Sequence, residues 1–575
     1  MIETTDSTDV NVNVACHLAR MAQAHPFKRA VVCPAGRDAA GRVVYAHLSF
    51  QQLDRESDQI AHGLLKTGIG LGTRTILMVR PGLDFFSLIF AIFKVGAVPV
   101  VVDPGMGIRR MLACFRSTRP QAFVGIPLAH AVCSVFRKTF KTVRYRVTVG
   151  RRWFWGGPTL TQLRAREWTP FAAAKTRTGD MAAILFTTGS TGPAKGAVYT
   201  HGNFEAQLHQ IRTHLDVSAD EVDLSTFPLF ALFYPALGVT AVVPDMDPTR
   251  PAQADPKRII EAIENQGVTN MFASPALLER VGAYGRQQGI RLPSLKRVIS
   301  AGAPVQARTI ELFSGLLADG AQIHTPYGAT EAVPIASILG REILSETRPL
   351  TEKGFGICVG QPIGDTVIRI IAISDEPIRR WSEELQVPQG DIGEITVKGG
   401  LVSPRYYENP LADSLAKIPE DGEVWHRMGD LAWMDKRGRI WFCGRKSQRV
   451  ITTGGTLYTI PCESIFNTHP AVHRSALVGI GPRTNQVPVI CVELRKNPPR
   501  IDRKAVRAAL LKLAQAHEIT QGIRIILFHD AFPVDIRHNA KIFREQLAVW
   551  VQKQVKPKGI RQPRKTDAHH DRNAS

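Results

Sequence analysis

The sequence predicts an α/β protein: a large N-terminal domain of doubly wound sheets with a β-rich subdomain, then a small, mobile α+β C-terminal domain. Three observations predict it. Short apolar, β-branched runs alternate with helical stretches over roughly the first 360 residues, which is typical of parallel strands covered by helices on both faces. Closely spaced strands and glycine turns follow, and a smaller unit with an amphipathic helix ends the chain. With 44% hydrophobic residues, the 575-residue chain can bury a large core, which excludes a mainly disordered protein.

The N-terminal part supplies the strands of the doubly wound sheets. Its most apolar window, 85–102, is interrupted by Lys94, Gly96 and Pro99, so it predicts a helix followed by a strand rather than a membrane span. The glycines of 68–72 lack dinucleotide-binding spacing and predict a turn before the next strand. The strands predicted here are 75–79, 99–102, 122–124, 183–186, 268–272 and 297–300.

The rest of the chain predicts three regions. Strands at 393–397, 438–443 and 449–452 belong to the β-rich part, and a strand at 489–494 to the C-terminal unit. Asp502 is expected to cap a helix whose Val506, Leu510 and Leu513 share one face. We therefore expect an N-terminal domain at 1–446, a C-terminal lid domain at 447–552, and a basic, disordered tail at 553–575.

The net charge of +21 is concentrated in two segments. Residues 137–152 hold seven cations and no acid, and the tail from Lys553 holds seven cations and two acids. Such segments are usually solvated faces, but they also suit acidic partner enzymes, an anionic membrane surface or nucleic acid. Trp153, Phe154 and Trp155 follow Arg151 and Arg152, and we interpret the three rings as core packing or a lid on an acyl pocket rather than a nucleic-acid site.

Cysteine spacing and the N-terminus indicate a cytoplasmic protein. The eight cysteines are scattered with no pair at CxxC spacing, so neither a zinc site nor a redox dithiol is predicted, and we expect reduced thiols. Residues 1–12 carry three acids and no basic region before an apolar core, so they do not form a signal peptide. Asp245 and Asp247 match a DxD metal pattern, which is too common to predict a site.

The strongest chemical signal is a loop that follows the strand at 183–186. Glycines let backbone N–H groups approach an anion, hydroxyls donate hydrogen bonds, and a lysine adds a charge, which together predict a polyphosphate-binding loop. It is not a Walker A loop, because Gly196 follows the lysine where Ser or Thr is required. The predicted contact residues are Thr187, Thr188, Gly189, Ser190, Thr191, Gly192, Lys195 and Gly196.

This loop resembles that of the adenylate-forming superfamily, which includes acyl-CoA synthetases, adenylation domains and luciferases. Further segments resemble its motifs in the expected order: 302–304, 327–331, 429–430, 444–445 and 538–541. The resemblance implies ATP and Mg²⁺, with Glu331 holding the metal, Thr330 at the α-phosphate, Asp430 and Arg445 at the ribose, and Lys541 between carboxylate and phosphate. It implies an adenine pocket formed by Gly302, Ala303, Pro304, Tyr327, Gly328 and Ala329.

Five positions depart from the superfamily pattern. Pro193 and Ala194 stand in reversed order, Met428 replaces a threonine before Gly429, and Ser447 stands where the interdomain hinge usually has Asp or Lys. Ala540 replaces the glycine before Lys541, and that motif is unusually spaced from Pro533, so Lys541 is the weakest of the catalytic assignments.

Several stretches resemble the olefin β-lactone synthetases of bacterial hydrocarbon biosynthesis, among them 146–156, 227–233, 243–250 and 426–430. The resemblance implies ATP-dependent adenylation of a long-chain 2-alkyl-3-hydroxy acid, then attack by its 3-hydroxyl to give a β-lactone, and assembly with other enzymes of that pathway. An acyl-CoA or acyl-AMP ligase is the alternative within the superfamily. A basic nucleic-acid- or membrane-binding protein is the alternative from another class. Phe230, Phe233 and Tyr234 are candidates for the acyl pocket or for plain core.

Overall fold

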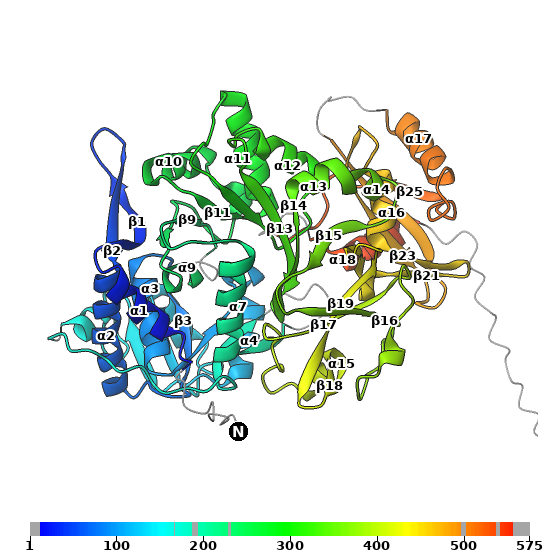
Figure 1. The fold of residues 1–575 in the computed structure, drawn as a ribbon. Coiled ribbons are helices and arrows are strands. Elements are labelled where there is room, and N and C mark those ends of the chain that lie inside the picture. The colour runs from blue at the N-terminus through cyan, green and yellow to red at the C-terminus, as the bar shows by residue number, and fades with distance from the viewer. Residues whose placement is uncertain are drawn as a thin grey trace, which may run out of the picture.

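The computed structural model describes residues 12–165, 167–186, 194–227, 232–495, 502–535 and 541–555. Two large sheets occupy the first three quarters of the chain, and a smaller unit packs beside them (Figure 1). The described residues contain no helix long and apolar enough to cross a membrane. The arrangement confirms the predicted α/β class with a β-rich part and a separate C-terminal sheet.

A six-stranded sheet forms the first layer, in the order β6-β5-β3-β4-β7-β8, and its pairs are parallel except β7 with β8. Its strands are β3 (Arg74–Met78), β4 (Val98–Val101), β5 (Ala122–Gly125), β6 (Tyr145–Thr148), β7 (Met181–Phe186) and β8 (Gly196–Thr200). The helices that accompany it are α1 (Ala15–Ala24), α2 (Phe50–Thr67), α3 (Leu83–Lys94), α4 (Ile108–Thr118), α5 (Pro127–Val135), α6 (Leu160–Arg164) and α7 (His201–His214).

Local sequence signals set these helix boundaries. Ser49 and Gln52 form a reciprocal capping box at the start of α2, and Gly68 ends it in the left-handed conformation, which glycine adopts at no steric cost. Thr200 and Asn203 form the same arrangement at the start of α7. The apolar window at 85–102 is α3 followed by β4, as predicted.

A second, 14-stranded sheet begins with a mostly parallel half in the order β13-β12-β11-β9-β10-β1-β2. Its strands are β1 (Arg29–Arg37), β2 (Val43–Ser49), β9 (Val222–Ser225), β10 (Thr240–Val242), β11 (Asn270–Ala273), β12 (Arg297–Ser300) and β13 (Gln322–Ala329). Its helices are α9 (Phe233–Ala236), α10 (Pro256–Gln266), α11 (Pro275–Gln288) and α12 (Ala307–Ser314).

The same sheet continues, antiparallel, into the β-rich part in the order β14-β15-β20-β19-β17-β16, with β18 beside β19. These strands are β14 (Ala332–Leu339), β15 (Ile357–Pro362), β16 (Val367–Ile371), β17 (Gly393–Lys398), β18 (Lys417–Glu420), β19 (Glu423–Met434) and β20 (Ile440–Arg445). Short helices connect them: α13 (Gly340–Glu342), α14 (Arg348–Glu352) and α15 (Pro410–Ala416).

The C-terminal unit is a three-stranded sheet in the order β23-β24-β25 with helices and a β-hairpin. Its elements are β21 (Val450–Thr452), β22 (Gly455–Leu457), α16 (Thr459–Phe466), β23 (Val472–Ile480), β24 (Val487–Leu494), α17 (Arg503–Gln515), β25 (Ile525–Phe528) and α18 (Arg544–Gln554). Asp502 caps α17 as predicted, although Ala514 rather than Leu513 completes the buried face. Helix α18 buries Leu547 and Val551 and continues to Gln554, so Lys553 belongs to a helix and not to the tail. The rest of the predicted tail, 556–575, lies outside the described residues.

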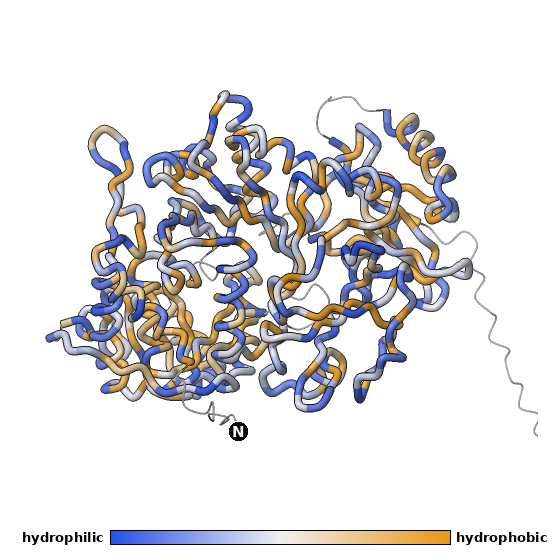
Figure 2. Tube along the Cα trace, in the orientation of Figure 1, coloured by the Kyte–Doolittle hydropathy of each residue, from blue (hydrophilic) through white to orange (hydrophobic). Residues whose placement is uncertain are grey.

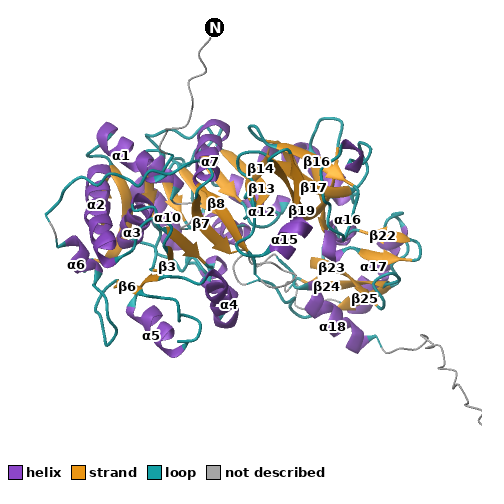
Figure 3. Ribbon diagram, turned by 90° about the horizontal axis from the view of Figure 1, so that it is seen from below, coloured by secondary structure: helices purple, strands orange, loops and turns teal. Residues whose placement is uncertain are grey.

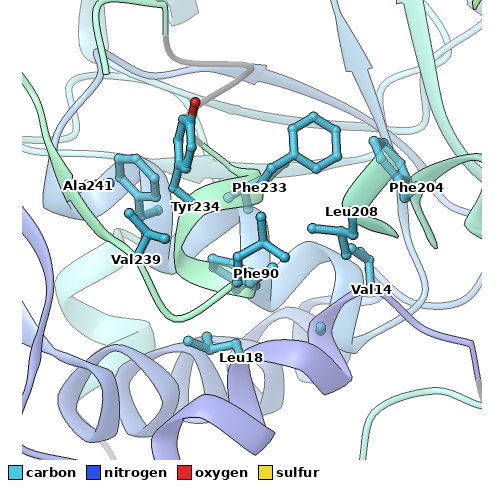
Figure 4. Packing of buried hydrophobic residues seen from close by; sticks show 14 of the residues in the cluster. Val14, Leu18, Phe90, Phe204, Leu208, Phe233, Tyr234, Val239 and Ala241 are labelled. Atoms are coloured by element: carbon cyan, nitrogen blue, oxygen red, sulfur yellow. The ribbon is translucent and has the colours of Figure 1, made fainter. Parts of the chain in front are cut away.

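The largest core cluster lies between the two sheets (Figure 4). Phe90 of α3, Phe204 and Leu208 of α7, and Phe233 of α9 pack there with Leu18 of α1. Figure 2 shows hydrophobic segments concentrated around α3 and the six-stranded sheet. This packing fixes the relative position of the two sheets, because close-packed interiors resist small displacements.

The three aromatic residues after Arg152 correct one prediction. Trp155 is buried and donates from Nε1 to Thr148 Oγ1 at 2.8 Å, so core packing is right for this ring. Trp153 and Phe154 are exposed, and none of the three rings lines the large cleft described below. The acyl-lid interpretation is therefore wrong.

A buried ionic cluster joins β17, β19 and the residue after β20. Arg427 donates to Glu394 Oε2 from Nη2 at 2.6 Å, and Lys446 Nζ lies 3.0 Å from Glu394 Oε1. The side chains of Arg427 and Glu394 are each 1% exposed. Arg427 also donates to the carbonyl oxygens of Ser374, Glu376 and Leu415.

We expect Arg427→Met to destabilise the protein strongly, since it leaves the Glu394 carboxylate buried with only Lys446. Breaking a buried pair in this way typically lowers the free energy of unfolding by about 3–5 kcal/mol. Urea denaturation followed by circular dichroism measures the change. Arg380→Met is the matched control, because the Arg380–Asp421 pair is almost fully exposed and its loss should change stability by at most about 1 kcal/mol. Equal effects of the two substitutions would contradict a stabilising role for the cluster.

Candidate active site

A cleft of about 1620 Å³ lies where the two sheets and the C-terminal unit meet. Its walls come largely from strand ends. Gly302, Ala303 and Pro304 follow β12, while Thr330 and Glu331 form the turn between β13 and β14. The carboxyl ends of parallel strands are the usual place for ligands in α/β sheets, and β12 and β13 end at this cleft.

Asp430, which is buried, forms an ion pair in the cleft wall with Arg445, whose side chain is 39% exposed. They are opposite each other in the register of β19 and β20, and Arg445 Nη1 lies 3.0 Å from Asp430 Oδ1. The hydroxyl of Tyr327 donates to Asp430 Oδ2 at 2.6 Å. Burial raises the pKa of Asp430 above its ordinary value, although Arg445, the Tyr327 hydroxyl and Lys541 oppose the rise. The pair thus presents a carboxylate and a guanidinium side by side, which suits hydroxyl groups of a ligand.

Glu331 accepts a hydrogen bond at Oε1 from the hydroxyl of Tyr406, 2.7 Å away. The ammonium groups of Lys195 and Lys417 lie 5.1 and 5.6 Å from the centre of the Tyr406 ring. Lys417 is buried behind the cleft, and desolvation lowers its pKa to about 8, although Glu331 and Asp413 act in the opposite direction. One acid and two cations are therefore organised around a single aromatic ring.

Sequence reasoning did not identify Tyr406 or Lys417. They lie 75 and 86 residues beyond Glu331 in the chain, in a stretch with no spacing typical of a site. The only local signal is a Tyr406-Tyr407 pair beside a basic residue, which is equally typical of a strand edge. Tertiary packing alone brings the two side chains to the carboxylate.

The turn that carries Thr330 and Glu331 is held from two sides. The hydroxyl of Tyr199 donates to the carbonyl of Thr330 at 2.5 Å. A Cβ atom at Gly328 would lie 2.6 Å from the carbonyl oxygen of Ala332, so this close approach of two backbone segments requires glycine.

Lys541 lines the same cleft, and it is close enough to Asp430 to lower the pKa of that carboxyl. Its backbone is anchored across the motif: the Asp535 N–H donates to the Lys541 carbonyl, and the Lys541 N–H donates to Asp535 Oδ1, both at 3.0 Å. Phe543 N–H donates to the Pro533 carbonyl at 2.9 Å. The unusual spacing from Pro533 is therefore accommodated by pairing of the two flanking segments.

One end of the cleft is apolar. Its lining includes the strand ends of the six-stranded sheet and one face of α3, with Phe233 from α9. Phe233 thus lies where an acyl-pocket residue was predicted, whereas Phe230 is outside the described residues. Tyr234 is a core residue instead, since its hydroxyl accepts a hydrogen bond from Asn270 Nδ2 at 3.0 Å and it does not line the cleft. The apolar lining residues are Leu77, Val79, Phe85, Ile89, Phe93, Val101, Ala183, Leu185 and Phe233.

Most of the described residues that the sequence singled out meet in this cleft. Gly196 does not line it, because it is the buried first residue of β8 and pairs with Phe186. The loop residues Thr187, Thr188, Gly189, Ser190, Thr191 and Gly192 lie outside the described residues, but Phe186 before the loop and Lys195 after it both line the cleft. The others that line it are Gly302, Ala303, Pro304, Tyr327, Gly328, Ala329, Thr330, Glu331, Asp430, Arg445 and Lys541.

The described residues also bear on the predictions about metal-binding side chains, cysteines and the DxD pattern. They contain no group of three or more His, Cys, Asp or Glu side chains that could hold a metal ion. All eight cysteines are free thiols, as expected. Asp245 pairs with Arg258 at 2.7 Å, and Asp247 accepts hydrogen bonds from Thr249, so the DxD pattern is structural.

Residues 18–407 match the family model described as AMP-binding enzyme. The chain belongs to the AMP-binding enzyme family. It is 49% identical over 548 residues to an olefin β-lactone synthetase of Stenotrophomonas maltophilia, which covers 94% of this chain and 98% of that protein. It is 48% identical to a protein of the same description from Xanthomonas campestris over 94% of this chain and 98% of that one.

A solved structure shares the fold. The crystal structure of the anthranilate CoA ligase AuaEII in complex with anthranoyl-AMP superposes with a TM-score of 0.76 at 19% identity, covering 96% of this chain and 99% of that one. The chain is therefore an adenylate-forming enzyme and not a basic protein whose role is binding alone.

We expect the affinity of this AMP-binding enzyme for AMP to fall as pH rises through about 8. Lys417 carries a positive charge below that pH and loses it above, so the attraction for a phosphate in the cleft weakens. At an effective dielectric constant of about 20, the attraction between one ammonium charge and one phosphate charge roughly 12 Å apart changes Kd by about tenfold. Isothermal titration calorimetry from neutral to alkaline pH measures the change.

Lys417→Met should bind AMP weakly at every pH, and the exposed Lys296→Met should follow the wild type. A wild-type Kd that stays constant across the range would contradict the assignment of this charge to the site.

Proposed function

We propose that this enzyme adenylates a long-chain 2-alkyl-3-hydroxy acid with ATP and then closes it to a β-lactone, releasing pyrophosphate and AMP. One observation carries the proposal: a single cleft is lined both by the polar side chains of Glu331, Asp430, Arg445 and Lys541 and by apolar side chains from α3, the six-stranded sheet and α9. The relatives described as olefin β-lactone synthetases, which align over 94% of the chain, support the choice of product.

The first step needs an activated acid, because a carboxylate is a poor electrophile. Its oxygen attacks the α-phosphorus of ATP, the bond to the β-phosphate oxygen breaks, and pyrophosphate leaves as acyl-AMP forms. Negative charge accumulates at the α-phosphorus, so cationic groups and hydrogen-bond donors lower the barrier. We assign this role to Lys541 and Lys195, with Thr330 at the α-phosphate and the loop 187–192 at the remaining phosphates.

The nucleoside is assigned to the residues around Asp430. The carboxylate of Asp430 and the guanidinium of Arg445 suit the ribose hydroxyls, and Gly302 to Pro304 with Tyr327 suit adenine. Because Tyr327 already donates to Asp430 Oδ2, the tyrosine orients this carboxylate before nucleotide binds.

Mg²⁺ is assigned to Glu331. A carboxylate oxygen is the donor that magnesium prefers, and in nucleotide sites the remaining ligands are usually phosphate oxygens and water. That fits Glu331, a buried acid in the cleft whose Oε1 accepts a hydrogen bond from the Tyr406 hydroxyl. When bound, the metal would neutralise phosphate charge. Tyr406 holds the Glu331 carboxylate in place for that purpose.

The second step is intramolecular. The oxygen of the substrate's 3-hydroxyl attacks the activated carbonyl carbon, the bond from that carbon to the AMP phosphate oxygen breaks, AMP leaves, and the hydroxyl proton passes to solvent. Holding nucleophile and electrophile in one molecule offsets part of the strain of a four-membered ring. The apolar end of the cleft, lined by Phe85, Phe93 and Phe233 among others, would hold the alkyl chains and exclude water, which would otherwise hydrolyse the acyl adenylate.

The domain boundary near residue 446 is part of the proposal. Lys446 is fixed to Glu394 of the N-terminal domain, whereas Gln448 accepts a hydrogen bond from Arg544 of the C-terminal unit at 3.2 Å. Ser447 lies between these two attachments and lines the cleft. We assign the hinge of the C-terminal lid domain, 447–552, to this residue.

The product decides between the proposal and an acyl-CoA ligase. Incubation with ATP, Mg²⁺ and a long-chain 2-alkyl-3-hydroxy acid should give a β-lactone and AMP by mass spectrometry, with or without coenzyme A. A matched 2-alkyl acid that lacks the 3-hydroxyl should stop at acyl-AMP. An acyl-CoA thioester formed only in the presence of coenzyme A would replace the proposal with the ligase activity.

Lys541→Ala should separate the two steps. Formation of acyl-AMP should slow by roughly 10²–10³, as for loss of other single electrostatic groups, while ring closure from presynthesised acyl-AMP should be nearly unchanged. Pyrophosphate release measures the first step and AMP release the second. Lys512→Ala, on the exposed side of α17, is the control. Normal activation by Lys541→Ala would remove Lys541 from the site, and equal damage to both steps would indicate a misfolded C-terminal domain.

A further inference from the structure

One edge of the N-terminal domain is strongly basic. Residues 104–166 contain thirteen Lys and Arg and no Asp or Glu. They form α4, α5, β5 and β6, and Figure 3 shows α5 and β6 at the outer edge of the molecule. Among the described residues, two of these cations form ion pairs with acids outside the segment. Arg119 pairs with Glu408, and Arg164 pairs with Glu56 and Asp84.

Helix α5 turns an apolar face outward. It has no charged residue, and its inward face is Ala129, His130 and Cys133. Leu128 is 64% exposed and Val135 is 74% exposed, and Phe136 directly after the helix is exposed as well. An aliphatic face on an otherwise basic surface is unusual for a protein that meets only water.

Two more exposed rings lie beside this helix. Trp155 stacks on His130 of α5, with centroids 5.0 Å apart and planes 13° from parallel. Trp153 and Phe154 pack around Trp155 at centroid distances of 5.4 and 5.0 Å, which places them near α5. Trp153 is 53% exposed and Phe154 is 78% exposed.

Cations surround these apolar side chains. Arg151 and Arg152 directly precede the two exposed rings, and both are exposed. A pocket of about 840 Å³ is lined by residues of the same basic segment, so a phosphate group bound in it would lie near several positive charges. It is lined by Arg116, Arg119, Arg137, Lys138, Lys141 and Thr142.

The same helix also forms part of the catalytic cleft. Ile126 and Ala129, at the start of α5, line the cleft together with Met78 and Val101. Leu128 lies between these two residues in the chain and faces outward. The outer apolar face and the cleft wall are thus two sides of one turn of helix.

We propose that this surface, defined as Leu128, Val135, Phe136, Trp153 and Phe154 with the cations Arg137, Lys138, Lys141, Arg151 and Arg152, docks on an anionic lipid bilayer. Exposed aromatic and aliphatic side chains among Lys and Arg are typical of interfacial membrane binding. Nucleic acid does not explain an aliphatic helix face, which offers a phosphate backbone no donor and a base no ring to stack on.

Docking would place the α5 wall of the cleft against the bilayer. This consequence depends on the proposed function, because only a long-chain acid would be stored in the membrane. Such an acid partitions into lipid through its alkyl chains, so an enzyme on the surface meets it at high local concentration. The docking itself does not depend on the reaction.

Vesicle sedimentation with the full chain tests the proposal. The protein should bind vesicles made of equal parts phosphatidylcholine and phosphatidylglycerol, bind phosphatidylcholine alone at least tenfold more weakly, and lose affinity as salt is raised. An apolar variant, Leu128→Ser with Phe154→Ser, and a charge variant, Arg137→Glu with Lys138→Glu and Lys141→Glu, should each bind anionic vesicles at least tenfold more weakly. The matched control reverses three exposed cations on other faces: Lys257→Glu, Arg286→Glu and Lys436→Glu.

Three results would overturn the assignment of lipid to this surface. These are no binding to anionic vesicles, equal binding by both variants and the wild type, and binding that disappears only when the chain is ended at Val555, which removes the basic tail. The first result would leave an acidic protein as the partner. Vesicle binding without β-lactone formation would retain the docking and refute the proposed function.

Both variants should release pyrophosphate at the wild-type rate with a short-chain, water-soluble acid. They should be slower with acid supplied in vesicles. Equal rates with vesicle-supplied acid would show that docking has no part in substrate uptake.

Discussion

The antiparallel pairing of β17, β19 and β20 fixes the positions of two charged pairs, Asp430 with Arg445 and Glu394 with Arg427. Within it, the register of β19 with β20 places Asp430 opposite Arg445, and the register of β17 with β19 brings Glu394 within reach of Arg427. A slip of one residue would turn each of these side chains to the opposite face of the sheet. The Asp430–Arg445 pair in the cleft and the Glu394–Arg427 pair therefore depend on one set of backbone hydrogen bonds.

The cleft combines two environments that ordinarily exclude each other. Its polar end crowds carboxylates and cations, and its apolar end is formed by α3 and the strand ends of the six-stranded sheet. Most of the apolar lining comes from α3 and the six-stranded sheet, whereas Glu331, Asp430 and Arg445 come from the 14-stranded sheet, and the large core cluster between the sheets holds the two together. A charged leaving group and long alkyl chains can then occupy one site without either being forced into the wrong environment.

The cluster around Tyr406 gathers one acid and two cations in and behind the cleft wall. Glu331 accepts from the Tyr406 hydroxyl, and the ring of the same tyrosine faces two ammonium groups. Placing a buried lysine behind the cleft costs desolvation energy, as its lowered pKa indicates, but it supplies a positive charge that needs no rearrangement when phosphate arrives. Lys541 differs because it comes from the C-terminal unit, across the proposed hinge at Ser447.

The sequence by itself determined the alternation of strands and helices, the cap of α17 at Asp502, and the set of residues from Gly302 to Lys541 that meets in the cleft. These are decided by local periodicity, by capping chemistry and by ordered motifs, all of which are written within a few residues of chain. Only the tertiary structure decided that Tyr406 and Lys417 belong with Glu331, that Tyr234 is core while Phe233 lines the cleft, and that Trp153 and Phe154 face solvent. The reason is that these outcomes depend on contacts between segments distant in sequence, and on which face of an element meets a neighbour, which spacing along the chain does not specify.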